Sequence, residues 1–126
     1  MNRKELRQKV YDKYGGHCAY CGKKIAIEDV QIDHIVPIRR GDTQQQLDKY
    51  DIQKGADDIS NYNPSCRSCN FRKGVYSIEQ FREEIRKQCK GIMKRSFQVR
   101  QSMDYGLLEY YDKPIVFYFE KFKNKL

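Results

Sequence analysis

Four cysteines stand in two C-x-x-C pairs, and residues of this type at this spacing can bind a metal ion. The pairs are Cys18 with Cys21 and Cys66 with Cys69. Four thiolates are the donors of closed tetrahedral zinc sites, which supply folding free energy to short domains. We therefore expect one structural Zn²⁺ that ties together the two ends of the segment between the pairs.

Three more residues that could do chemistry lie close to these pairs in the sequence. Asp33 and His34 are adjacent within the bracketed segment, and Asn70 directly follows Cys69. We expect these three residues to form a catalytic or binding centre beside the zinc rather than at it. A lone histidine is more often a core or surface residue satisfied by the backbone, and this is the alternative for His34.

The length and composition predict one small domain that spans residues 1–126. Of the 126 residues, 39% are hydrophobic and 33% are charged, so the core is thin and a metal would help to stabilise it. No apolar run approaches the length of a membrane span, and we expect no secretory signal. We therefore expect a cytoplasmic protein without a membrane partner, whose paired cysteines bind metal instead of forming disulfides.

Positive charge is concentrated in one part of the chain. The formal net charge is +8, and residues 72–100 include nine basic residues against three acidic ones. Such a patch favours a polyanion such as nucleic acid, whereas the alternative is a solvated helix face with ion pairs such as Glu83–Lys87. The candidate DNA contacts are Arg72, Lys73, Arg82, Arg86, Lys90 and Lys94.

The N-terminal part of the chain is expected to form a helix that leads into the first cysteine pair. Apolar residues at helical spacing predict this helix over residues 3–14, and Gly15-Gly16 would end it. His17 follows directly and could bind zinc in principle. We expect it at the surface or behind the ligands instead, because four cysteines already fill a tetrahedral shell.

A β-rich run over residues 30–36 predicts a strand, with Asp33 and His34 near its end because Pro37 follows. Neighbouring side chains of a regular strand point to opposite faces. Asp33 and His34 can therefore serve one site only at a strand end, a twist or a bulge.

The polar segment 39–60 is expected to be a surface loop or a short helix. Its few apolar anchors are Leu47, Tyr50 and Ile52. Asp57 and Asp58 have no partner at a recognisable metal-binding spacing. We therefore expect them to act as turn and capping residues.

The second cysteine pair leads into a predicted helix that ends at Gly74. Helical geometry over residues 69–73 would put Asn70 and Lys73 on one face, where they could hold a ligand and a phosphate. A capping box at 77–80 then predicts a second, amphipathic helix. Its apolar positions are Ile78, Phe81, Ile85, Cys89 and Ile92. Cys89 is therefore expected in the core and not as a zinc ligand.

Two weaker patterns follow toward the C-terminus. Residues 96–108 are predicted to form another helix that buries Phe97, Val99 and Met103. Residues 115–119 are β-branched or aromatic, which predicts a C-terminal strand that closes the domain.

Taken in order, these motifs resemble the HNH endonuclease family, in the zinc-binding form found widely in bacteria and phages. The motifs are the two cysteine pairs, Asp33-His34-Ile35-Val36-Pro37, Asn61, Asn70 and Lys73-Gly74. The resemblance covers about residues 14–74 and leaves 77–126 as an extension of helices and a strand. It implies an α+β fold with a ββα-metal core that the four-cysteine zinc site staples.

The resemblance also implies a role for each site residue. His34 would be the general base that activates water, and Asp33 and Asn70 would sit at a catalytic divalent cation, Mg²⁺ or Mn²⁺. Asn61 would orient the loop that carries the histidine. The implied activity is one-metal hydrolysis of phosphodiester bonds in DNA, expected to be double-stranded. The zinc would take no direct part, because four thiolates leave no open position for water.

The sequence departs from the usual family pattern in its central loop. Gly41-Asp42 stands where two glycines are common, and the stretch before Asn61 is longer than usual. A non-catalytic, zinc-stapled nucleic-acid-binding module is an alternative that would not need Asp33, His34 or Asn70. A dithiol redox protein would need only one cysteine pair. Cleavage of both DNA strands would require a homodimer, a partner protein or two successive nicks.

Overall fold

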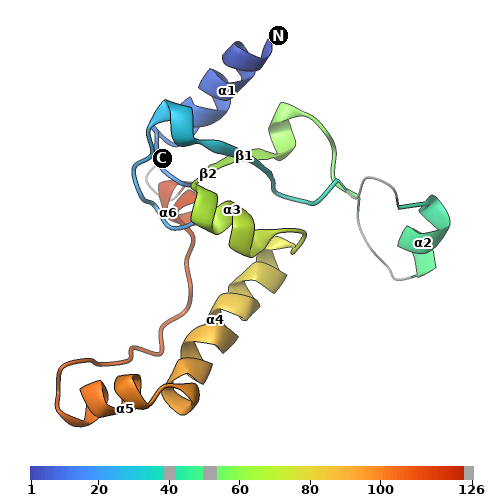
Figure 1. The fold of residues 1–126 in the computed structure, drawn as a ribbon. Helices are drawn as coiled ribbons and strands as arrows, with labels where there is room; N and C mark the ends of the chain where they lie inside the picture. The colour runs from blue at the N-terminus through green and yellow to red at the C-terminus, as the bar shows by residue number, and fades with distance from the viewer. Residues whose placement is uncertain (39–41, 50–53, 124–126) are drawn as a thin grey trace. The chain divides into compact units, whose positions relative to one another are not determined.

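A pair of short antiparallel strands carries two of the residues with predicted chemistry, Asp33 and His34. The computed structural model describes residues 1–38, 42–49 and 54–123. In it, β1 (Gln31–His34) pairs with β2 (Tyr62–Ser65), so that Asp33 lies opposite Asn63 and His34 opposite Tyr62. Figure 1 shows the strands side by side, with a helix directly after β2. The α+β class and the two-stranded hairpin are therefore confirmed.

Helices and short 3-10 turns make up the rest of the regular structure among the described residues. In chain order the helices are α1 (Arg3–Asp12), α2 (Gln44–Lys49), α3 (Arg67–Lys73), α4 (Ile78–Arg95), α5 (Phe97–Asp104) and α6 (Tyr118–Lys123). The 3-10 turns are η1 (Ile27–Asp29) and η2 (Ile59–Asn61). None of these helices has the length and apolar character that a membrane crossing requires.

The chain divides into two compact units. One consists of Met1–Ile78 together with Val116–Leu126, and the other is Glu79–Ile115. The first unit contains both cysteine pairs and both strands, whereas the second contains most of α4 and all of α5. That residues 1–126 behave as a single domain stays a prediction.

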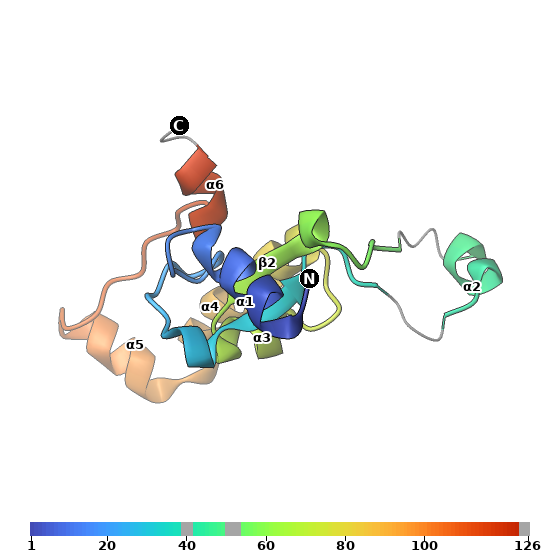
Figure 2. The ribbon, with the colours of Figure 1, turned by 90° about the horizontal axis from the view of Figure 1, so that it is seen from above.

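Helix α1 forms as predicted and packs beside the strands through its apolar side. It contacts β2 and η1, and Figure 2 shows it next to the strand pair. Val10 and, just after the helix, Tyr14 are buried there. The helix ends at Asp12, and Gly15 and Gly16 follow with φ angles of 62° and 83°. The positive φ of Gly16 favours glycine at this turn, and a Cβ there would also lie 2.8 Å from the Tyr11 hydroxyl.

The C-terminal strand predicted over residues 115–119 is wrong, because α6 begins at Tyr118 instead. The backbone amides of Tyr118 and Phe119 donate to the carbonyls of Tyr20 and Ala19, so the first turn of α6 is bonded to the first cysteine pair. The Glu120 side chain accepts from the Phe117 amide, as in a capping box. The aromatic run therefore packs as a helix start and not as a strand edge.

In the second unit, the apolar stripe of α4 is only partly buried. Phe81 is buried, but Ile92 is 44% exposed and Cys89 is also exposed, so the prediction of Cys89 as a core residue is wrong. Helix α5 confirms the predicted helix over 96–108, although it buries no residue fully and Phe97 is 63% exposed. Helical periodicity predicted that these apolar positions would be buried, but the second unit contains too few other elements to pack against them.

Within the predicted loop 39–60, a short helix forms and the chain then returns to β2. Helix α2 buries Leu47, as expected of an anchor. Tyr50 and Ile52, the other two expected anchors, lie outside the described residues. Asp58 caps η2 by accepting from the Ser60 amide, which confirms its predicted capping role.

Candidate active site and metal centre

The four cysteines of the two C-x-x-C pairs come together in the first unit. Their sulfur atoms all lie within 4.8 Å of one another, and the Sγ atoms of Cys21 and Cys66 are 3.9 Å apart. Tetrahedral zinc bonded to four sulfurs implies S···S distances of about 3.8 Å. The cluster thus has the spacing and the soft donors that a structural zinc site needs, as the sequence predicted.

Hydrogen bonds favour the thiolate form of Cys18, whereas burial raises the pKa of Cys21 and the hydrogen bond to Cys18 raises the pKa of Cys69. The Cys69 thiol and nearby backbone amides lower the pKa of Cys18 to about 4. Cys66 caps α3, and its sulfur accepts from the backbone amide of Cys69 at 3.4 Å. On the other side, the amide of Ala19 donates to the carbonyl of Pro64 at 2.9 Å, which joins the first pair to β2. The metal centre is therefore built directly onto the strand pair.

Asp33 is the buried residue of β1, with only 4% of its surface exposed. Its Oδ2 accepts a hydrogen bond from the Tyr20 hydroxyl and lies 3.2 Å from the Lys73 ammonium, whereas its Oδ1 lies 3.4 Å from the same ammonium. Burial raises the pKa of the Asp33 carboxyl, although Lys73 acts in the opposite direction. Burial also raises the pKa of Tyr20, which keeps the phenol protonated as a donor.

Lys73 is fully buried and does not face solvent. Besides Asp33, its ammonium donates to the backbone carbonyl of His34 at 2.8 Å. The prediction that Lys73 contacts a DNA phosphate therefore conflicts with the structure, because its charge is already used inside the protein. One side chain of α3 thereby holds both residues at the end of β1.

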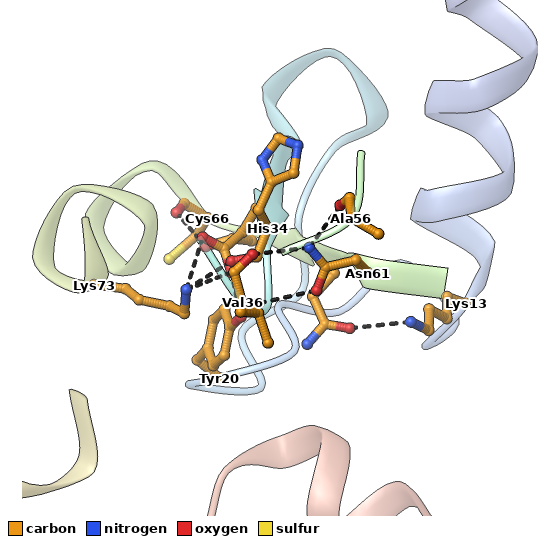
Figure 3. Close-up of polar contacts among 11 residues, drawn as sticks. Lys13, Tyr20, His34, Val36, Ala56, Asn61, Cys66 and Lys73 are labelled. Carbon is orange, nitrogen blue, oxygen red and sulfur yellow. Dashed lines mark hydrogen bonds and ion pairs between the residues drawn. The ribbon is translucent and has the colours of Figure 1, made fainter. Parts of the chain in front are cut away.

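Asn61 holds the backbone that follows His34. Its Oδ1 accepts from the Val36 amide at 2.9 Å, and its Nδ2 donates to the carbonyls of Val36 and Ala56, both at 2.8 Å. The Asn61 carbonyl also accepts from the Ile35 amide. Figure 3 shows Lys73 and Asn61 on either side of the backbone that carries His34 and Val36. These are the contacts that the predicted orienting role of Asn61 would use.

The His34 ring projects away from these backbone contacts (Figure 3). Its Nε2 lies 3.0 Å from Oδ1 of Asp57, and its side chain is 26% exposed. The Tyr62 hydroxyl donates to the same Asp57 oxygen at 2.7 Å, and the rings of His34 and Tyr62 pack edge to face. Asp57 lies in a bend, as expected of a turn residue, and its carboxylate also contacts the histidine, which the sequence did not predict.

Asp33, His34 and Asn70 line one pocket of about 360 Å³. Asp33 and His34 reach it from the end of β1, and the half-buried Asn70 reaches it from α3. Asp42, predicted only as part of the central loop, adds another carboxylate to the pocket wall. Asp33, His34 and Asn70, which were predicted from the sequence to form one centre, thus lie together in space.

Most of the other basic candidates have partners. Arg82 pairs with Glu79 at 3.1 Å, Arg86 with Glu83 at 2.9 Å, and Lys90 with Asp112 at 3.6 Å. Arg72 and Lys94 are exposed. The ion pairs are those of a solvated helix face, and they leave α4 less available to phosphate than its charge alone indicates.

Comparison with known proteins agrees with the geometry. A family model described as HNH endonuclease matches residues 18–75. The chain is also 36% identical over 75 residues to "SPbeta prophage-derived putative HNH endonuclease YoqL" of Bacillus subtilis (strain 168). That match covers 59% of this chain but only 30% of the relative, so the chain spans less than a third of its length. Residues 18–75, which match the HNH endonuclease model, hold both cysteine pairs and the pocket.

Proposed function

We propose that the protein is a metal-dependent DNA endonuclease that hydrolyses phosphodiester bonds in double-stranded DNA. The observation that carries the proposal is the shared pocket, in which a histidine lies beside a carboxylate and a carboxamide. The match to the HNH endonuclease model supports a nucleic acid as the substrate, and the net charge of +8 favours a polyanion.

The donors in the pocket fit a hard divalent cation. Asp33 supplies carboxylate oxygens and Asn70 a carboxamide oxygen, which are the ligand types that Mg²⁺ and Mn²⁺ prefer. Oδ1 of Asp33 accepts from the Lys73 ammonium through one lone pair, and its second lone pair can bind a cation. When bound, such a cation would polarise the phosphate and stabilise the departing oxygen.

The protein's own residues would divide the remaining work. His34, in its neutral form, would take a proton from the attacking water. Lys73 and Asn61 would hold the backbone of this strand end, so that the ring stays aligned with the scissile phosphate. The four-cysteine zinc site would stabilise the fold without touching the substrate, because a closed site has no open position.

Cleavage of a supercoiled plasmid by purified, zinc-loaded protein with Mg²⁺ tests the proposal. We expect His34→Ala to fold, retain zinc and bind DNA but to lose ~10²–10⁴-fold in rate, the contribution of a general base. Asn70→Ala should also fold, and higher Mg²⁺ or added Mn²⁺ should restore part of its activity. No cation concentration should restore His34→Ala, because its defect is the missing base.

The same assay addresses the alternative function. A zinc-stapled nucleic-acid-binding module would bind the plasmid without cutting it, and His34→Ala would then behave like the wild-type protein. If His34→Ala cleaves at the wild-type rate, the residue is only a strand terminus and the proposed mechanism fails.

A further inference from the structure

The contact between Asp57 and His34 is built by the long loop before Asn61. The carboxylate Oδ1 of Asp57 lies 3.0 Å from Nε2 of His34 and accepts from the Tyr62 hydroxyl at 2.7 Å. Tyr62 is the residue that pairs with His34 across the two strands, so the strand register places the ring and the phenol side by side. The carboxylate therefore has two donors that approach the same oxygen.

The backbone around Asp57 is fixed to the strand end. The Gly55 amide donates to the Pro37 carbonyl at 2.8 Å, and Asn61 donates to the Ala56 carbonyl at 2.8 Å. A side chain at Gly55 would put its Cβ 1.8 Å from the Val36 carbonyl oxygen, so only glycine allows this close approach. Asp57 is thus held against the same short stretch of backbone that carries His34.

The chemistry of the pair decides which nitrogen of the ring carries the proton. An ionised carboxylate can only accept hydrogen bonds, so Nε2 of His34 must be the donor. In a neutral imidazole the other nitrogen, Nδ1, is then left with a lone pair and can accept a proton. Within the described part of the chain, the structure records no hydrogen bond to Nδ1.

We infer that Asp57 is a positioning residue, which holds His34 as the Nε2–H tautomer and directs Nδ1 toward the water that is to be deprotonated. The inference rests on the proposed function for its catalytic consequence, but the contact itself can be tested without activity. Because Asp57 is 56% exposed, the pair contributes little to stability, and its effect should lie in the orientation of the ring.

Nitrogen-15 NMR of the zinc-loaded protein without Mg²⁺ tests the contact. His17 and His34 are the two histidines of the chain, so their ring signals can be separated. Above the pH at which histidine is charged, His34 should show a slowly exchanging Nε2–H proton. The proton should disappear in Asp57→Ala. His17 is an internal control, because its Nδ1 contacts the Tyr14 carbonyl instead and should not change. An unchanged His34 spectrum in Asp57→Ala would overturn the inference.

Plasmid cleavage tests the consequence. We expect Asp57→Ala to lower kcat by about tenfold or more, with KM unchanged, and to lose less than the ~10²–10⁴-fold that removal of the base would cost. Asp57→Glu, which keeps a carboxylate, should recover part of the loss. Asp58→Ala is the matched control, because it removes the neighbouring capping carboxylate and should leave kcat intact.

The two experiments separate the inference from the proposed function. A protein that shows the ring proton but never cuts DNA would disprove the nuclease activity, and with it the catalytic role of Asp57. If the wild-type protein cuts and Asp57→Ala cuts equally well, the nuclease stands and the positioning role is wrong.

Discussion

The ammonium of Lys73 contacts two residues that have different proposed tasks. It neutralises the buried carboxylate of Asp33 and bonds the backbone carbonyl of His34. Burial lowers the pKa of Lys73, and the nearby carboxylate of Asp33 opposes that shift. A buried pair of this kind is a positioning device more than a source of net stability.

We expect Lys73→Met to destabilise the protein by about 3–5 kcal/mol, because it leaves a buried carboxylate without its counter-charge. Denaturant unfolding of zinc-loaded protein measures the effect. Arg72→Met is the matched control, since Arg72 lies on the same helix but is exposed, and its loss should change stability little. Equal unfolding midpoints for the two variants would show that the ion pair does not form. The double variant Lys73→Met with Asp33→Asn should be more stable than Lys73→Met alone.

The site residues were predictable from sequence where their spacing is local. The two C-x-x-C pairs, Asp33-His34 and Asn70 carry their chemistry in short motifs, and the structure brings them together. Asp57 was not predictable, because its contact with His34 depends on how a long loop returns to the strands. The burial of Lys73 was not predicted either. Its spacing from Asn70 indicates which face of the helix it lies on, but not which other part of the protein packs over that face.

At the scale of elements, the aromatic run before α6 shows how tertiary contacts override strand propensity. The rings of Phe117 and Tyr20 pack edge to face at 5.4 Å. The backbone amides of Tyr118 and Phe119 donate to carbonyls of the segment between Cys18 and Cys21. A strand at this position would instead have needed the free edge of another strand to pair with. Glu120, three residues after Phe117, was the sequence signal that could have indicated a helix start.

Helix α4 combines concentrated charge with acidic partners, and DNA binding can show which dominates. If the helix contacts phosphates, replacing Arg82, Arg86, Lys90 and Lys94 with glutamine should weaken binding to every DNA sequence. The slope of log affinity against log salt should fall by about one unit for each phosphate that the variant no longer neutralises. Fluorescence anisotropy at several salt concentrations measures this slope, and an unchanged slope would make α4 a solvated face.

Removing the acidic partners is the complementary test of the same helix. Glu79 and Glu83 hold Arg82 and Arg86 in ion pairs, so Glu79→Gln with Glu83→Gln should release both guanidinium groups from these pairs. If α4 lies against DNA, this double variant should bind more tightly and with a steeper salt dependence. Binding that does not change would place the DNA elsewhere, with the exposed Arg72 of α3 as the next candidate.

At the scale of the whole molecule, the unit that holds the site is not continuous in sequence. The family match ends at residue 75, but the chain returns to this unit at Val116, after the second unit. The α6 amides bonded to Ala19 and Tyr20 are part of the support of the metal centre. The core of the site was predictable from its motifs, but this return was not, because the contact joins segments about a hundred residues apart.

We expect the first unit to fold only when zinc is bound. Binding to four thiolates contributes about 10–16 kcal/mol in small zinc domains, which exceeds what a thin core supplies. We therefore expect Cys66→Ser to lose zinc and most of the folded population, whereas Cys89→Ser, at an exposed position of α4, should bind one zinc per chain and unfold like the wild-type protein. Metal analysis measures the bound zinc, and circular dichroism measures the folded population.

A mild chelator that removes Mg²⁺ but not thiolate-bound zinc should stop cleavage reversibly without unfolding. If Cys66→Ser kept its zinc, or if that chelator unfolded the protein, the division between a structural and a catalytic metal would be wrong.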